Sequence, residues 1–393
     1  MLWQPRIPEK YYKLTEEELL QGIYARRKQL GDKLIILGHH YQQDDVIRFA
    51  DFTGDSFRLS QLAAERVRET GAKYIIFCGV HFMAESADIL TDENVQVILP
   101  DLTAGCSMAD MADYEDTVMA WDAIHKTLKK QNWKGRVIPI TYMNSSAAIK
   151  AFCGEHGGVV CTSSNADRVF EWAMTGGTTP RSEDEDIKLL FLPDQHLGRN
   201  TAHAYGIDVE KHTTVWDPKA IELGDKLGGN TPERLLSAKV ILWKGHCSVH
   251  QLFRPEHVRQ IKEKDPTRKI IVHPECMKEV VDLADESGST GKILKTIRES
   301  KPGDKWAVGT EIHLVQRIAA EMKERNVDVI SLTPFQCLCT TMYRIDPVHF
   351  FWAIDNLAQG KVVNRIEVPG KIREYATLAL GRMLELTAQP TVA

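Results

Sequence analysis

The sequence lacks several features that would place it at a membrane or on nucleic acid. It has no apolar run of membrane-spanning length, and its first residues, MLWQPRIPEKYYKL, contain no apolar core of signal-peptide length. It also lacks an excess of basic residues, since 49 Lys and Arg against 54 Asp and Glu give a net charge of −5. General nucleic-acid binders are basic. We therefore predict a cytoplasmic protein with no nucleic-acid partner and no membrane association.

The chain also lacks a CxxC pair, although it has eight cysteines. This removes the usual signature of zinc ribbons and thioredoxin-like redox sites. In a reducing compartment the cysteines should be free thiols or metal ligands and should not form disulfides. They are Cys78, Cys106, Cys153, Cys161, Cys247, Cys276, Cys337 and Cys339.

What the chain has in quantity is a short apolar run followed at once by polar or sulfur-bearing residues. Ten such runs occur: LIIL, YIIF, VQVIL, VIPI, GVVC, KLLFL, VILW, KIIV, KWAV and VDVISL. They alternate with helical stretches such as SFRLSQLAAERVRETG, which predicts an α/β fold with parallel sheets covered on both faces. Ten strands fit a single eight-stranded barrel poorly. Pro139 within VIPI weakens the prediction of a strand there, or indicates an edge or terminal strand.

The spacing of these runs suggests three groups within the 393 residues. Leu34, Val137 and Val240 each begin a run, and both steps are 103 residues, an ordinary size for a small α/β domain. Thr15, Glu18 and Gly31 predict an earlier helix with a capping box and a glycine stop. The predicted division is a helical segment over 1–30, α/β domains over 31–113, 114–238 and 239–332, and a segment over 333–393 that carries a cysteine loop and helices packing back on the core.

Three loops carry cysteines where ligands of open parallel sheets bind, outside the carboxyl ends of the strands. Cys106 lies in DLTAGCSMAD, Cys247 in KGHCSVH, and Cys337 and Cys339 share TPFQCLCTTM. Three such loops spread along the chain suggest three ligands brought together by folding. Three thiolates suit an iron–sulfur cluster with one open iron, or a zinc ion with a water, and composition does not separate the two.

Other candidates are serines at helix starts and titratable residues at strand ends. GDSFRLSQLA, TSSNADRVFEWA and GSTGKILKTI each place a serine where it caps a helix or helps to bind an anion. The Glu in HPEC, between a proline and a cysteine, is the least routine of the candidates for proton transfer. These candidates are His39, Tyr41, Tyr142, His250, His273, Glu275 and Glu311.

The motifs resemble those of one family, quinolinate synthase, in consistent order from about Leu34 to Ile345. They are HHYQ, GDS, MAESADIL, AGCSMA, TYMNSSAAIKA, CTSSNA, FLPDQHLGRNTA, GHCSVH, HPEC, GST, GTE and CLCTTMYRI. The resemblance implies three α/β/α domains related by pseudo-threefold symmetry, with the active site at their junction. It also implies condensation of iminoaspartate with dihydroxyacetone phosphate to quinolinate, phosphate and water, on the route to NAD. A functional link to aspartate oxidase, the expected source of iminoaspartate, would follow.

The resemblance also implies a 4Fe–4S cluster held by Cys106, Cys247 and Cys339. Cys339 is preferred because the family cysteine precedes x-x-Met, here Met342, and Cys337 stays an alternative. Glu275, Tyr41, Tyr142 and His273 correspond to acid–base candidates. The charged segment near 172–188 exceeds the compact family pattern and is interpreted as a surface insertion. The substrate-binding residues implied are His39, Ser56, Tyr142, Asn144, Ser163, His250, His273, Glu275, Ser289 and Thr290.

Three other functions use the same residues. An iron–sulfur hydratase or dehydratase would need the same open iron for another small carboxylic acid. A non-enzymatic iron–sulfur sensor would be expected to carry a DNA-binding unit or a partner helix. A zinc enzyme would replace the cluster with one ion.

Overall fold

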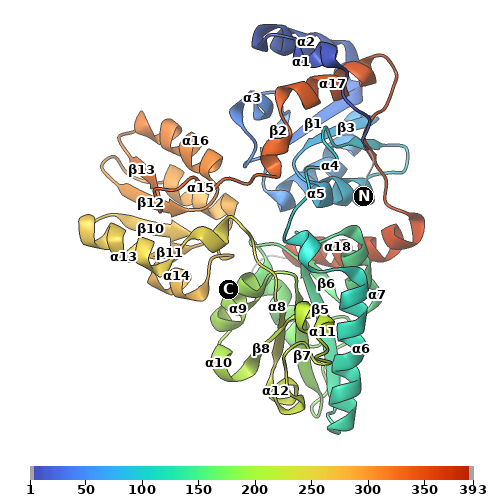
Figure 1. The fold of residues 1–393 in the computed structure, drawn as a ribbon, viewed down its shortest axis with the longest axis vertical. Helices are drawn as coiled ribbons and strands as arrows, with labels where there is room; N and C mark the ends of the chain where they lie inside the picture. The colour runs from blue at the N-terminus through green and yellow to red at the C-terminus, as the bar shows by residue number, and fades with distance from the viewer. Residues whose placement is uncertain (1–3, 389–393) are drawn as a thin grey trace. The chain divides into compact units, whose positions relative to one another are not determined.

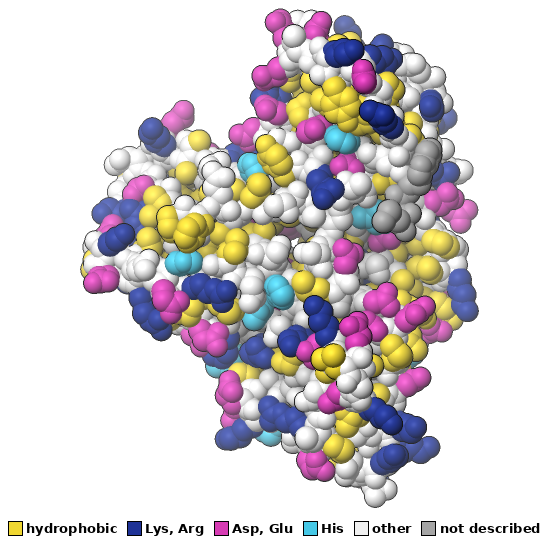
Figure 2. Space-filling view, in the orientation of Figure 1, with side chains coloured by type: hydrophobic (Ala, Val, Ile, Leu, Met, Phe, Trp, Pro, Cys, Tyr) yellow, Lys and Arg dark blue, Asp and Glu magenta, His cyan; other side chains and the backbone are white. Residues whose placement is uncertain are grey.

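The computed structural model describes residues 4–388, which fall into two compact units. Unit 1 comprises the described residues up to Cys106 together with Glu311–Arg317 and Cys337–Pro369. Unit 2 comprises Ser107–Thr310, Ile318–Gln336 and the described residues from Gly370 onward. Charged side chains of both signs are interspersed over the face drawn in Figure 2.

Unit 1 contains one five-stranded sheet of order β14-β4-β3-β1-β2. Its neighbours are parallel except for β14, which pairs antiparallel with β4. The interior strand β1 is buried throughout, as its apolar sequence requires of a strand covered on both faces. The strands are β1 (Leu34–His39), β2 (Phe52–Gly54), β3 (Tyr74–Cys78), β4 (Gln96–Ile98) and β14 (Arg365–Ile366).

The first long helix of unit 1 begins and ends where the sequence predicts. In α2 (Glu16–Leu30), Thr15 and Glu18 form the capping box, and Gly31 ends the helix at a φ of 52°. Helix α17 (Pro347–Ala358) packs against α2, where Arg26 pairs with Asp355 at 2.7 Å (Figure 1). The other helices are α1 (Glu9–Tyr12), α3 (Asp44–Ile47), α4 (Ser56–Thr70) and α5 (His81–Leu90).

Unit 2 contains two sheets, the first of order β6-β5-β7-β9-β8 with all pairs parallel. Helix α18 (Gly370–Ala388) packs on α7 (Ala147–Glu155) because Gly154 has no side chain: a Cβ there would lie 1.9 Å from the Tyr375 carbonyl oxygen. The strands are β5 (Gly135–Tyr142), β6 (Val159–Cys161), β7 (Asp186–Leu192), β8 (Thr213–Trp216) and β9 (Val240–Trp243). The other helices are α6 (Tyr114–Lys130), α8 (Ala166–Met174), α9 (Gln195–Ala204), α10 (Val209–His212), α11 (Pro218–Glu222) and α12 (Pro232–Ser237).

The second sheet of unit 2 has four parallel strands in the order β11-β10-β12-β13. Its core strands β10 and β12 are buried from their second residue onward. The strands are β10 (Lys269–Val272), β11 (Glu286–Ser287), β12 (Lys305–Gly309) and β13 (Asp328–Ser331). Its helices are α13 (Pro255–Lys264), α14 (Lys278–Leu283), α15 (Thr290–Arg298) and α16 (Ile312–Lys323), of which residues from Ile318 onward belong to unit 2.

All ten predicted strands exist, and the predicted parallel α/β class is confirmed, with three separate sheets in place of a barrel. Two local predictions are wrong. Val240, expected to open the third group, begins β9, which pairs with β7 and β8 and so belongs to the sheet β6-β5-β7-β9-β8. Pro139 lies in an interior strand, where it is tolerated because β6 pairs only from Ile140 onward. The division into domains over 31–113, 114–238 and 239–332 stays a prediction.

Candidate active site

A buried group of acid, phenol and imidazoles lies in unit 2 where three strands end. Tyr142 is the last residue of β5, His273 follows β10 directly, and Glu275 comes two residues later. His250 begins a short 3-10 helix in the loop after β9. Tyr142 and His250 lie at the carboxyl ends of two strands of the sheet β6-β5-β7-β9-β8, and His273 and Glu275 follow the carboxyl end of β10 in the other sheet of unit 2. Ligands of parallel sheets bind at such carboxyl ends, and here those of two sheets come together. All four residues are less than 7% exposed.

Glu275 is the centre of this group. Its Oε2 lies 2.5 Å from His250 Nδ1 and 3.4 Å from His273 Nδ1, and it forms a hydrogen bond with Tyr142. The rings of His250 and His273 stack with centroids 4.4 Å apart and planes 13° apart. On its other side, His250 Nε2 lies 3.1 Å from the hydroxyl of Thr310, which is fully buried. Ring orientation is therefore fixed from two sides.

Burial sets the charge of this group, and the neighbours modify it. Burial and the neighbouring His250 lower the pKa of His273 to about 3, against the opposing effect of Glu275. Burial alone would raise the pKa of Glu275, but His250, His273 and the hydrogen bonds from His250 and Tyr142 hold it below its ordinary value. At neutral pH, Glu275 is thus a carboxylate beside a neutral His273.

Cys247 adds a sulfur to this acid–imidazole group. One ligand atom from each of Cys247, His250 and Glu275 lies within 4.8 Å of the other two. Glu275 Oε1 is buried without a hydrogen-bond partner among the described residues. An unsatisfied buried carboxylate oxygen is costly unless a ligand or proton meets it. The sequence predicted these residues together, and the structure brings them together.

Burial separates the eight cysteines into two sets. Cys106, Cys247 and Cys339 are half-buried, and these are the three predicted ligands. Cys337 is fully buried, and burial raises its pKa to about 11; burial also raises the pKa of Cys339, so accessibility and not pKa distinguishes the two thiols. The other buried cysteines are Cys78, Cys153, Cys161 and Cys276.

Unit 1 carries the predicted H-x-Y pair at the end of β1. His39 is buried, its Nδ1 accepts a hydrogen bond from the Tyr41 backbone N–H at 3.1 Å, and the two rings contact edge to face at 4.6 Å. Arg317 of α16 holds this loop by donating to the carbonyl oxygens of His40 and Gln42. This role of Arg317 could not be predicted from the sequence, because the residue lies on an otherwise ordinary amphipathic helix.

Helix starts carry the predicted hydroxyls. In unit 1, Ser56 is the first residue of α4, and Asp55 provides the cap. In unit 2, Ser289 caps α15, and Thr290 is its first residue. A hollow of about 540 Å³ in unit 2 is lined by Ser163, Ser289 and Pro274 of the HPE motif. The structure therefore places two of the predicted serines beside the strand ends that carry His273 and Glu275.

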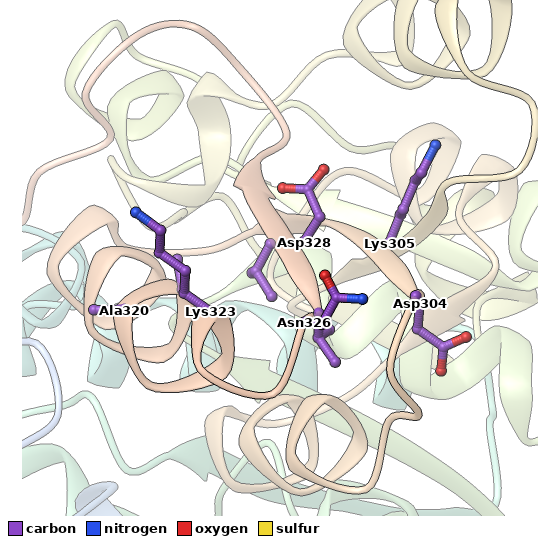
Figure 3. Close-up of a pocket in the computed structure, with 10 residues that line it drawn as sticks. Asp304, Lys305, Ala320, Lys323, Asn326 and Asp328 are labelled. Carbon is purple, nitrogen blue, oxygen red and sulfur yellow. The ribbon is translucent and has the colours of Figure 1, made fainter.

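A second hollow, of about 630 Å³, lies at the opposite, amino end of β12 and β13. Figure 3 shows that the side chains of Lys305 and Lys323 extend away from each other there. Lys305, Lys323 and Asn326 are exposed. The predicted catalytic residues do not line it, so it is not the candidate active site.

Asn144 and Thr310 complete the unit 2 site in different ways. Asn144 Oδ1 is buried without a hydrogen-bond partner among the described residues, which fits its predicted role as a substrate-binding group. Thr310, which meets His250, was not singled out from the sequence. Its only signal was its place in the GTE motif, immediately after β12.

The parallel α/β fold and the buried acid–imidazole–thiol group at the strand ends define an α/β enzyme with donors for a metal centre. The family model for the quinolinate synthetase A protein matches residues 21–385. The chain therefore belongs to the quinolinate synthetase A family.

Relatives from distant bacteria match nearly the whole chain. It is 52% identical over 379 residues to the quinolinate synthase of Acidobacterium capsulatum, covering 96% of this chain and 95% of that protein. It is 50% identical over 388 residues to that of Rhodopirellula baltica, with coverages of 96% and 93%. For the quinolinate synthase of Bacillus subtilis the identity is 48% over 381 residues, with coverages of 97% and 96%.

Proposed function

We propose that this enzyme is a quinolinate synthase that condenses iminoaspartate with dihydroxyacetone phosphate, yielding quinolinate, phosphate and water for NAD biosynthesis. The observation that carries the proposal is the buried Glu275–His250–His273 group beside the half-buried Cys247. Membership of the quinolinate synthetase A family supports the same activity.

The proposed cofactor is a 4Fe–4S cluster held by Cys106, Cys247 and Cys339. These three thiols are half-buried whereas the other five are buried, so the donor set fits a group that needs three accessible sulfurs. When bound, such a cluster would supply a Lewis-acidic iron able to polarise a hydroxyl or carboxylate of the substrate.

The proton-transfer roles fall to the residues around Glu275. As a carboxylate at neutral pH, Glu275 can accept a proton from a substrate carbon or hydroxyl. Tyr142, hydrogen-bonded to it, and Tyr41 of unit 1 are the proposed acid partners. His273 is neutral at that pH, so it can donate a hydrogen bond to a developing oxyanion or accept a proton.

Binding two anionic reactants requires donors that are already oriented. We propose that the hydroxyls of Ser56, Ser163, Ser289 and Thr290 hold carboxylate or phosphate, aided by the N–H groups at helix starts. Asn144, with its buried Oδ1, and the imidazoles of His39 and His250 would complete the set. Holding both reactants makes the carbon–carbon step effectively intramolecular.

A zinc ion bound by Cys247, His250 and Glu275 is a weaker alternative. Two ligands of one tetrahedral zinc, each at about 2 Å, lie roughly 3.3 Å apart. His250 Nδ1 and Glu275 Oε2 are only 2.5 Å apart, which is a hydrogen-bond distance. The two atoms are therefore too close together to be neighbouring ligands of one tetrahedral zinc ion.

The test is purification without oxygen, followed by metal analysis and a quinolinate assay. We expect about four irons and four sulfides per chain, a broad visible absorption, and quinolinate only when both iminoaspartate and dihydroxyacetone phosphate are supplied. Omission of either reactant is the control.

Three other outcomes are decisive. An iron–sulfur protein that forms no quinolinate but hydrates or dehydrates another small acid would be a hydratase. Cluster without turnover of any acid would indicate a sensor, and zinc without sulfide would replace the cluster proposal.

The proposal includes a reducing, cytoplasmic setting, supported by the eight free cysteines. Within residues 4–388, every helix falls short of the length and apolarity that crossing a membrane would require. A functional link to an aspartate oxidase is proposed because iminoaspartate is the kind of unstable imine that oxidation of an amino acid supplies.

A further inference from the structure

Asp194, which no proposed step uses, ties the Cys247 loop to a helix in unit 2. It caps α9, and its Oδ1 accepts the backbone N–H groups of His196 at 2.7 Å and Leu197 at 2.8 Å. The Cys247 backbone N–H also donates to this carboxylate. The next residue, Gln195, donates its backbone N–H to the carbonyl of Gly245, two residues before the cysteine, at 3.0 Å. Asp194 is fully buried.

Glu311 makes the same set of contacts in unit 1, at the start of α16. Its Oε2 accepts the N–H groups of His313 at 2.8 Å and Leu314 at 3.3 Å. Its Oε1 accepts the Cys339 backbone N–H at 3.4 Å. The next residue, Ile312, donates to the carbonyl of Cys337, again two residues before the cysteine, at 3.1 Å. Glu311 is also fully buried.

The two arrangements share one pattern. A buried acid accepts the N–H groups two and three residues later and the N–H of a cysteine, and the residue after the acid bonds the carbonyl two before that cysteine. The local sequences, DQHL from Asp194 and EIHL from Glu311, share His and Leu at the same places.

The third cysteine loop, which carries Cys106, has the same backbone hydrogen bond to the start of a helix. The residue that corresponds to Asp194 and Glu311 is different there. His81, at the start of α5, donates its N–H to the carbonyl of Ala104, two residues before Cys106, at 2.9 Å. The position that corresponds to the acid is Val80, which caps α5 without a side-chain hydrogen bond. A helix and its cysteine loop can therefore be joined without an acid. Asp194 and Glu311 are thus not needed for that connection, and they serve another role.

We propose that Asp194 and Glu311 are positioning residues that fix the backbone at Cys247 and Cys339, and thereby aim two of the three sulfurs at the cluster. This inference rests on the proposed function, because it assumes that these cysteines hold the cluster. A buried carboxyl group that accepts several backbone N–H groups is a rigid support, and such outer supports commonly set metal affinity.

The two acids differ in a way that sharpens the test. Within the described residues Asp194 Oδ2 has no hydrogen-bond partner, and both helix N–H groups bond to Oδ1, so an Asn can keep these two bonds. Glu311 uses both oxygens, so a Gln can keep only one half of its contacts. Rescue by the amide should therefore succeed at position 194 and fail at position 311.

The experiment compares holoenzymes purified without oxygen: wild type, D194A, D194N, E311A and E311Q. The matched control is D113A, because Asp113 caps α6 in the same manner, accepting from Glu115 at 2.8 Å and Asp116 at 3.3 Å, on a helix without a cysteine. The readouts are iron and sulfide per chain, the visible and electron paramagnetic resonance spectra, and the rate of iron release to a chelator. Circular dichroism reports the fold.

We expect iron release to be about 10–100-fold faster in D194A, E311A and E311Q, while D194N and D113A release iron like the wild type. Folded D194A and E311A that keep a wild-type cluster and release rate would overturn the positioning role and leave the proposed function intact. Wild-type enzyme without iron and sulfide would overturn both. Equal release from D194N and D194A would overturn the role of the Asp194 oxygen.

Discussion

The two ends of the sheet β11-β10-β12-β13 are both polar, yet they differ in how their polar groups are satisfied. At the amino end, Lys305 lies 3.0 Å from Asp265, and both partners of the pair are in contact with water. At the carboxyl end, His273, Glu275 and Thr310 are almost fully buried, and Glu275 Oε1 still lacks a hydrogen-bond partner among the described residues.

The difference shows which property marks a site. Water screens exposed charges, so the charged side chains that line the amino-end hollow of Figure 3 interact only weakly with one another. Buried polar groups perturb each other's protonation, which is what general acid–base chemistry needs.

Cys247→Ser should remove the cluster and the activity together, because a serine hydroxyl is a poor substitute for a thiolate on iron. Iron and sulfide content and the visible spectrum measure the first effect, and quinolinate formation the second. Cys276→Ser, at a buried cysteine outside the proposed ligand set, is the control. A coloured and active Cys247→Ser enzyme would exclude Cys247 as a ligand.

Glu275→Gln should leave the cluster in place and lower turnover about 10²–10⁴-fold, because the amide keeps the shape but cannot take a proton. Single-turnover quinolinate formation with the cluster spectrum as reference measures this. Turnover close to that of the wild type would remove Glu275 from the proton-transfer steps.

Thr310→Val should lower turnover about tenfold and destabilise the fold by about 1–3 kcal/mol, because it takes away the hydroxyl that meets buried His250 Nε2. Steady-state kinetics and denaturant unfolding measure the two effects. Thr310→Ser, which restores a hydroxyl, should recover most of the activity; failure to recover would assign the loss to packing.

At the amino end, Lys305→Met should leave turnover unchanged and have only a small, pH-dependent effect on stability. The hydroxyl of Thr267 and the Lys305 ammonium lower the pKa of Asp265 to about 2. A lowered pKa adds stability above the ordinary value near 4, which is lost as the pH falls towards 2. The stability difference from wild type should therefore be present at pH 7 and vanish near pH 2.

Unfolding curves across that pH range measure the effect, and Lys323→Ala, in the same hollow, is the neutral control. Loss of turnover in either variant would make the amino-end hollow functional and remove the contrast between the two ends.

Much of the fold follows from local pattern. Each of the ten apolar runs became a strand because a short Val- and Ile-rich run flanked by polar residues fits a sheet covered on both faces. Short strands such as β2 and β11 were not predicted, because two or three residues are too few to show a periodic pattern. The sheet that includes β9 could not be predicted from spacing, since strand pairing is decided by packing.

The motifs around the site were visible in the sequence, but their contacts were not. HPEC and GHCSVH placed Glu275 and His250 at strand ends. Their 2.5 Å contact and the support from Thr310 depend on how loops about 25 and 60 residues apart in the chain meet. Arg317 and Asp194 act through hydrogen bonds to backbone groups. Because every residue has such groups, the residue types in the sequence do not reveal these contacts.

The alternation of strands and helices, the family, and the residue types at the strand ends could be predicted from the sequence, because these are properties of short segments. Which sheet each strand joins and which three cysteines stay half-buried depends on the folded chain. The folded chain also decides which carboxylates face imidazoles or cysteine N–H groups. The physical reason is that burial and pairing are set by residues distant in the chain, and burial is what changes the chemistry of a side chain.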